Sequence, residues 1–165
     1  MDLSDIVQKN KADKGLRFAN FLIDTILFYC SFLIFAFVIG FIAIVLGFDT
    51  SFLVELENID PLLDRLITAI IMVFYFFGFE TLTKGRSIGK FITGTKVVTL
   101  EGEIPTANVF LKRSFCRIIP FEAFSFFGEN GWHDSIPKTA VVVKKHFDYE
   151  SNLSLDVDTI GKEFE

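Results

Sequence analysis

Two long apolar runs dominate the pattern of hydrophobic and polar positions. The first extends from Thr25 to Phe48 without a charge, about 24 residues, more than the roughly 20 that a helix needs to cross a bilayer core. A buried soluble helix rarely runs so long without a polar face, and the run is too long for a cleaved signal peptide. The second extends from Leu62 to Leu82, behind Pro61, which suits the first turn of a helix. The pattern therefore predicts two membrane-spanning helices.

The chain changes character after the second span. Residues 84–90 read as a Gly-rich basic loop, and Thr95–Leu100 reads as a strand with Glu103–Ile104 as a candidate short partner. Thr139–Val143 is a second β-type run. We expect it to pair with residues 96–100 in a small cytoplasmic sheet.

A third helix is predicted from Ala107 to about Ile119, with Thr106 as its N-cap. This helix carries three cations near its middle, Lys112, Arg113 and Arg117. They make a full membrane span costly, and a basic amphipathic helix lying in the interface fits better. The aromatic stretch Phe121–Phe127 is expected to dip into the headgroup region, and Trp132 stands where an interfacial anchor would.

These elements predict an all-α membrane protein with two transmembrane helices, a third interfacial amphipathic helix and a small cytoplasmic β element. We divide the chain into a polar N-terminal segment (residues 1–15), a membrane domain (16–143) and a flexible acidic C-terminal tail (144–165). The N-terminal segment is expected to fray or to lie on the membrane surface.

Charge is segregated along the chain, so the net charge of −5 conceals the topology signal. The loop between the spans is acidic and has Arg65 only at its far edge, whereas basic residues precede the first span and follow the second. The positive-inside rule then places both termini in the cytoplasm. Half of the residues are hydrophobic and 22 are Phe, more apolar surface than a soluble domain of this size hides.

The composition favours no catalytic or cofactor chemistry. Cys30 and Cys116 read as small buried hydrophobes, and His133 and His146 have no partners at metal-ligand spacing. The segment 85–90 resembles a P-loop only superficially, because its glycine spacing is one short and Phe91 replaces the required Ser or Thr. We therefore expect no enzyme, no cofactor, no metal site and no nucleic-acid partner.

Polar residues gather at the cytoplasmic ends of the two spans. Arg17, Asn20 and Asp24 lie near one helical face at the start of the first span, and Glu80 lies at a similar depth in the second. Two carboxylates at one level can share a cation or a proton, or each can pair with a nearby Lys or Arg in a structural network. Asp134 completes this candidate polar site, as a turn cap or an arginine partner.

The remaining basic residues form a candidate cytoplasmic face for lipid headgroups. This face comprises Lys84, Arg86, Lys90, Lys112, Arg113 and Arg117. Charge that merely sets topology explains these residues equally well.

The order of these motifs resembles the RDD family of small bacterial membrane proteins. The resemblance covers about residues 15–143 and rests on four segments, namely Arg17–Asp24, Glu80 with Gly85–Val98, Leu111–Ser114 and His133–Val142. Arg17 and Asp24 match the arginine and one of the two aspartates that name the family, while Asp64 is the only aspartate of the second span and stands at its start. The resemblance implies a multi-pass protein of the bacterial cytoplasmic (inner) membrane, and implies cation or proton transport only weakly.

Two classes of function stay open on the sequence. The first is a transport-related module for Na⁺ or H⁺, which requires an oligomer because two spans alone cannot enclose a pathway. The second is a non-transport scaffold or accessory subunit that contacts lipid or protein through its basic cytoplasmic face. Expected partners are the bilayer and a second copy or a membrane partner subunit.

Overall fold

The computed structural model describes residues 2–48, 51, 58–119 and 131–163, with side chains as far as residue 154. Its two long helices are α2 (Lys14–Val45) and α4 (Pro61–Leu82), and both are long and apolar enough to cross a membrane. The prediction of two spanning helices is therefore confirmed by length and composition.

Both spans begin at a side-chain cap. The Asp13 carboxylate accepts a hydrogen bond from the Leu16 amide at 2.7 Å, and Asp60 accepts from the amides of Leu62 and Leu63. Pro61 occupies the first turn of α4, where a missing N–H costs nothing. These caps satisfy amides that have no partner within the helix, and they fix where each span starts.

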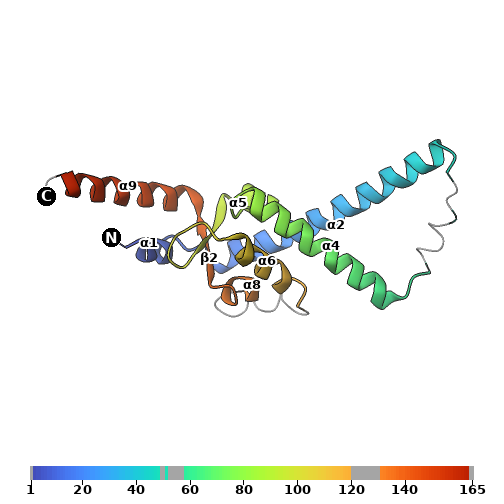
Figure 1. Ribbon diagram of the computed structural model, residues 1–165, viewed down its shortest axis with the longest axis horizontal. Coiled ribbons are helices and arrows are strands. Elements are labelled where there is room, and N and C mark those ends of the chain that lie inside the picture. Colours follow the sequence, from blue (N-terminus) through green and yellow to red (C-terminus); the bar gives the residue numbers. More distant parts are fainter. Residues whose placement is uncertain (1, 49–50, 52–57, 120–130, 164–165) are drawn as a thin grey trace.

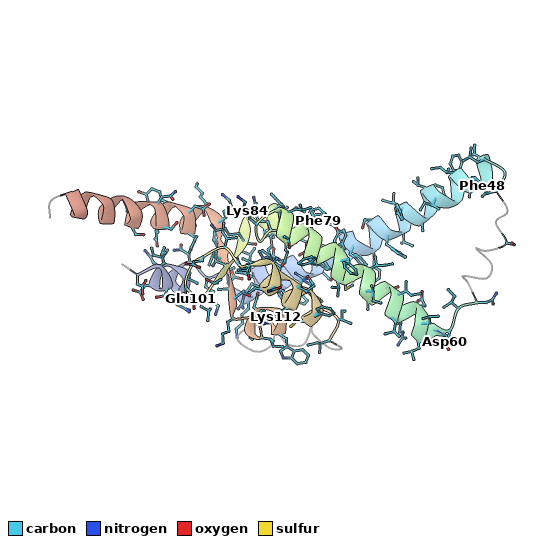
Figure 2. All side chains as sticks on the ribbon, in the orientation of Figure 1. Phe48, Asp60, Phe79, Lys84, Glu101 and Lys112 are labelled. Atoms are coloured by element: carbon cyan, nitrogen blue, oxygen red, sulfur yellow. The ribbon has the colours of Figure 1, made fainter. Side chains whose placement is uncertain are left out.

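The spans cross once and then diverge (Figure 1). At the crossing, the Phe28 ring of α2 lies 5.3 Å from the Tyr75 ring and 6.2 Å from the Phe76 ring of α4, measured between centroids. Beyond it the side chains of both helices project outward, and Phe48 and Asp60 mark the separated ends (Figure 2). This outer part has an apolar surface suited to hydrocarbon.

A two-stranded antiparallel sheet pairs β1 (Thr95–Thr99) with β2 (Thr139–Val143), in the register Thr95 to Val143. The predicted pairing of these two segments is confirmed. Residues 103–104 add no strand, although the Thr99 amide donates to the Glu103 carbonyl. One face of the sheet packs on Ile6, Val7 and Phe147, and the other on Ala12 and Leu16.

The chain ends differ from the prediction. The N-terminal segment contains helix α1 (Leu3–Lys9), and its buried Ile6 and Val7 belong to the core beside the sheet. The segment predicted as a loose tail forms helix α9 (Lys144–Glu163), and its Phe147 is buried in the same core. The prediction missed both helices because each places only one or two apolar residues on the sheet, too few for a periodic signal.

Three short helices surround the spans at the end nearest the chain termini: α5 (Ile88–Thr93), α6 (Ala107–Cys116) and α8 (Trp132–Ser135). Helix α5 contacts α2, and α6 contacts α4 and α8. In Figure 1, α5 lies on one side of the spans and α6 and α8 on the other, at one level along the molecule. Helix α6 corresponds to the predicted third helix and ends at Cys116, three residues early; residues 121–127 lie outside the described part.

Candidate functional site

A buried polar cluster lies where the three short helices meet the two spans. We define it by seven side chains: Asp24, Glu80, Ser87, Lys90, Arg113, Arg117 and Asp134. Every one of them is at least nine-tenths buried. The cluster draws on five helices or their caps, so it connects the spans to the surrounding elements.

Asp24 caps a helix to which it does not belong. Its carboxylate accepts a hydrogen bond from the Gly89 amide at 2.7 Å and another from the Ser87 hydroxyl. Ser87 is the N-cap residue of α5 but makes no capping bond of its own. Asp24 thus supplies the carboxylate that the N-terminus of α5 needs, and its charge is favourable beside that helix end.

This contact requires glycine at position 89. A Cβ at Gly89 would lie 2.8 Å from the Asn20 carbonyl oxygen and 2.9 Å from Asp24 Oδ1. Gly85, where the chain leaves α4, has φ of +92° and an equally close approach to the Val97 carbonyl. The two glycines that superficially resemble a P-loop therefore serve close packing and a turn.

Glu80 is the most highly connected acid of the cluster. Lys90 Nζ donates to Oε1 at 2.9 Å, Arg113 Nε donates to Oε2 at 3.1 Å, and Arg117 Nη2 lies 3.4 Å from Oε1. Lys90 also donates to Ser87 Oγ at 3.1 Å, which links Glu80 to Asp24. Three cations converge on one carboxylate that has no exposure to solvent.

Arg113 joins Glu80 to the sheet and to α8. Its Nη1 donates to Asp134 Oδ1 at 2.6 Å, to the His133 carbonyl at 3.1 Å and to the Thr139 hydroxyl. Burial by itself lowers the pKa of Arg113, but Glu80 and Asp134 outweigh it and the pKa is raised. Burial alone would raise the pKa of Asp134, yet His133 and Arg113 hold it below its usual range. The pair therefore stays ionised.

Arg117 stands between the two carboxylates of the spans. Its Nη2 lies 3.9 Å from Asp24 Oδ2, and its guanidinium lies 4.2 Å from the centroid of the Phe76 ring. The side chain also lines a cavity of about 520 Å³ along α4, which reaches Asp64 in the first turn of that helix. The cavity wall is mostly apolar, with Tyr29, Leu66 and Met72 among its residues.

The structure brings together Asp24, Glu80 and Asp134 of the predicted polar site. Asn20 is buried beside them and bonds Thr93 and Thr95, which ties α2 to α5 and β1. Arg17 is buried one turn from the start of α2, where its Nε donates to the Asp13 carbonyl at 3.4 Å.

Half of the predicted basic face lies in the interior instead. The headgroup-facing assignment is wrong for Lys90, Arg113 and Arg117, whose side chains are buried against Glu80. Lys84 and Lys112 are exposed, and Arg86 is half-buried with its guanidinium 3.8 Å from the Phe91 ring centroid. On α6 the spacing 110, 113, 114, 117 marks the inward face, so a helical wheel places both arginines beside Phe110.

Sequence reasoning left out Ser87 and Gly89 of the cluster region, as well as His133 and Thr139. The sequence alone does not indicate that a serine hydroxyl or a glycine amide will hydrogen-bond a carboxylate more than 60 positions away. Lys90 was predicted only as a cation of the basic face, although its position three residues after the N-cap Ser87 places the two side chains on the same side of α5. Among the described residues, no group of three or more His, Cys, Asp or Glu is arranged to hold a metal ion.

No curated protein and no solved structure matches the chain significantly. The family comparison does give a match, to the model of the RDD family over residues 11–137. That stretch contains both spans and every member of the polar cluster. The chain therefore belongs to the RDD family of membrane proteins.

Proposed function

We propose that the chain is a membrane-integral scaffold or accessory subunit, and that its polar cluster is a structural tie and not an open ion site. One observation carries this proposal: each carboxylate of the cluster already has a cation beside it. Glu80 has three, Asp134 has Arg113, and Asp24 has two hydrogen-bond donors with Arg117 at 3.9 Å. A Na⁺ ion needs oxygen ligands whose charge is still available, and here that charge is neutralised.

The connectivity of the cluster supports the same role. Buried charges that are paired and hydrogen-bonded hold a unique arrangement, because breaking one pair leaves an uncompensated charge in a low dielectric. The cluster links α2, α4, α5, α6 and α8, and through Thr139 it reaches the sheet. It would keep the cytoplasmic-side body, with α1, α9 and the sheet, in one orientation relative to the membrane, as a docking platform requires.

The proposal includes the orientation and location expected from the sequence. Both termini lie in the cytoplasm and the acidic segment between the spans lies outside, in a bacterial inner membrane. The distribution of Lys and Arg supports this orientation. A second copy or a partner subunit would pack on the apolar surfaces that the diverging spans expose.

Cation or proton transport by an oligomer is the second candidate, and Arg117 is the feature that favours it. This cation stands between Glu80 and Asp24 and lines the cavity beside α4. If Arg117 moved toward the cavity, Asp24 would lose the cation that lies 3.9 Å from it and would become available to a cation or a proton, whereas Glu80 would keep Lys90 and Arg113. Two spans cannot enclose a pathway, so this function requires more than one copy.

Ion flux in proteoliposomes separates the two candidates. Under the scaffold proposal, sodium uptake and the pH response of an entrapped dye equal those of protein-free vesicles. Protein-dependent flux that Asp24→Asn or Glu80→Gln abolishes, in variants shown to be folded, would overturn it in favour of transport. Asp148→Asn is the matched control, because Asp148 pairs with Lys96 and Lys144 on α9, away from the cluster.

A further inference from the structure

The three short helices expose apolar side chains around the polar cluster. On α5, α6 and α8, and shortly after the ends of α6 and α8, six large side chains are between 36% and 65% exposed. They are Phe91, Ile92, Phe115, Ile119, Trp132 and Ile136, and we name them the collar. Their polar neighbours in sequence, Lys90, Arg113 and Asp134, point inward. This is the reverse of a soluble surface.

We propose that the collar lies in the cytoplasmic leaflet of the bilayer, so that lipid surrounds the polar cluster and exposed lysines at the collar contact anionic headgroups. This inference rests on the proposed scaffold role of the cytoplasmic side. It identifies lipid, and not protein, as the partner of that surface.

The length of α2 places the collar at the right depth. At 1.5 Å per residue its 32 residues extend about 48 Å, whereas the hydrocarbon core is about 30 Å thick. If the segment from Thr25 to Val45 fills the core, residues 14–24 lie in the cytoplasmic interface. Asp24 and Glu80 then mark the inner boundary, and α5, which contacts α2 around Asp24, lies at the same level.

The distribution of the collar favours lipid over a protein partner. Helix α5 is on one side of the spans and α6 and α8 are on the other (Figure 1). A docked protein covers one side, but a bilayer surrounds all sides. Trp132 has the ring type that is enriched at membrane interfaces, with an apolar body and one N–H donor.

Exposed cations accompany the collar. Lys84 and Lys112 project on opposite sides of the body in Figure 2, and Lys138 follows α8. Lys84 and Lys138 have φ angles of 55° and 53°, a left-handed conformation that glycine adopts without strain. Lysine at two such positions indicates that the side chain itself is used, and an anionic headgroup fits its ammonium group.

Trp132 is the only tryptophan in the chain, so its fluorescence reports the depth of the collar directly. The full-length protein is reconstituted into phosphatidylcholine vesicles with bromine placed either near the headgroup end or near the methyl end of the acyl chains. We expect stronger quenching by the headgroup-end bromine and weak quenching by aqueous acrylamide. Strong acrylamide quenching without bromine quenching overturns the proposal, and shielding from both assigns the collar to a protein contact and also overturns it.

Two relocated tryptophans calibrate the measurement in a Trp132→Phe background. Leu33→Trp, on the exposed surface of α2, should respond to the methyl-end bromine. Tyr149→Trp, 70% exposed on α9, should respond to acrylamide alone. The quenching measurements do not depend on ion flux. A result that overturns the membrane position of the collar can therefore be told apart from one that overturns the proposed scaffold function.

The headgroup contact has its own test. Brominated phosphatidylglycerol should quench Trp132 more than brominated phosphatidylcholine at the same mole fraction, with a local enrichment of up to about fivefold for each lysine. The triple variant Lys84→Gln, Lys112→Gln, Lys138→Gln should lose this preference. Lys145→Gln, an exposed lysine on α9, should retain it. Equal quenching by the two lipids in the unmodified protein refutes the anionic contact.

Discussion

Gly89→Ala gives a sharp test of the contact between α2 and α5, because two physical effects have opposite signs there. Alanine is the better helix former, by about 0.8–1 kcal/mol in a helix interior. At Gly89, however, its Cβ would meet the Asn20 carbonyl oxygen at 2.8 Å and Asp24 Oδ1 at 2.9 Å. The backbone oxygen cannot rotate away, so α5 must shift.

The magnitude follows from what that shift disrupts. Overpacking in a closely packed site costs about 1–3 kcal/mol. Lengthening the 2.7 Å bond from the Gly89 amide to Asp24 weakens a charge-assisted hydrogen bond, worth about 1.5–3 kcal/mol. After the gain in helix propensity, we expect a net loss of about 2–4 kcal/mol.

Two other helical glycines serve as matched controls. At Gly40 in α2 and Gly78 in α4, an added Cβ would meet no atom within 4 Å outside the helix's own neighbouring backbone. Gly40→Ala and Gly78→Ala should therefore be neutral or stabilising by up to about 1 kcal/mol. Unfolding in mixed micelles of mild detergent and dodecyl sulfate, followed by circular dichroism, measures all three. If Gly89→Ala is as stable as the controls, α5 does not pack on α2 as described.

Two further predictions concern pH and topology. The pKa of Asp134 is lowered in the folded protein, so the stability that Asp134 contributes is complete above its ordinary pKa of 3.8 and is lost as the pH falls below that value. The variant Asp134→Asn should therefore lose this part of the acid dependence when its unfolding is measured from pH 6 downward. A pH profile equal to that of the unmodified protein would contradict the pairing of Asp134 with Arg113. The topology is tested in a cysteine-free background with a maleimide that does not cross membranes. Asn58→Cys, between the spans, should react in intact cells, whereas Asn152→Cys, on α9, should react only after lysis. The reverse labelling would contradict the proposed orientation.

The sequence predicted the elements that follow from local pattern. Two long apolar runs identified the spans, and β-type runs at residues 95–100 and 139–143 identified the strands and their pairing. These predictions succeed because hydrophobic period and run length are local properties. The acids Asp24, Glu80 and Asp134 could also be singled out, because a carboxylate near a membrane boundary needs a partner, and the fold brings all three into the polar cluster.

The partners of those acids were not predictable in the same way. Lys90, Arg113 and Arg117 look on the sequence like topology-setting charge, and only the fold shows that they point inward to Glu80. Long-range pairing is set by how α5 and α6 pack on the spans, and a single sequence does not encode that packing as a periodic signal. Helices α1 and α9 were missed for a similar reason, since their stability comes from the sheet they cover.

The pair Glu80 and Lys90 carries the central claim that the cluster is a structural tie. Their charged atoms lie 2.9 Å apart, and both side chains are at most 1% exposed. Removing one member strands a buried charge, so Glu80→Gln and Lys90→Gln should each cost about 3–5 kcal/mol. The partly exposed pair of Lys96 and Asp148 is the control, and Asp148→Asn should cost at most about 1 kcal/mol.

The most direct measurement is therefore a double-mutant cycle on Glu80 and Lys90, with unfolding free energies measured in the same mixed micelles. The predicted coupling energy between the two substitutions is about 1–3 kcal/mol, with the double variant more stable than the sum of the single losses implies. A coupling energy within about 0.5 kcal/mol of zero, with single losses no larger than that of Asp148→Asn, would show that the cluster does not hold the spans to the body that carries the sheet.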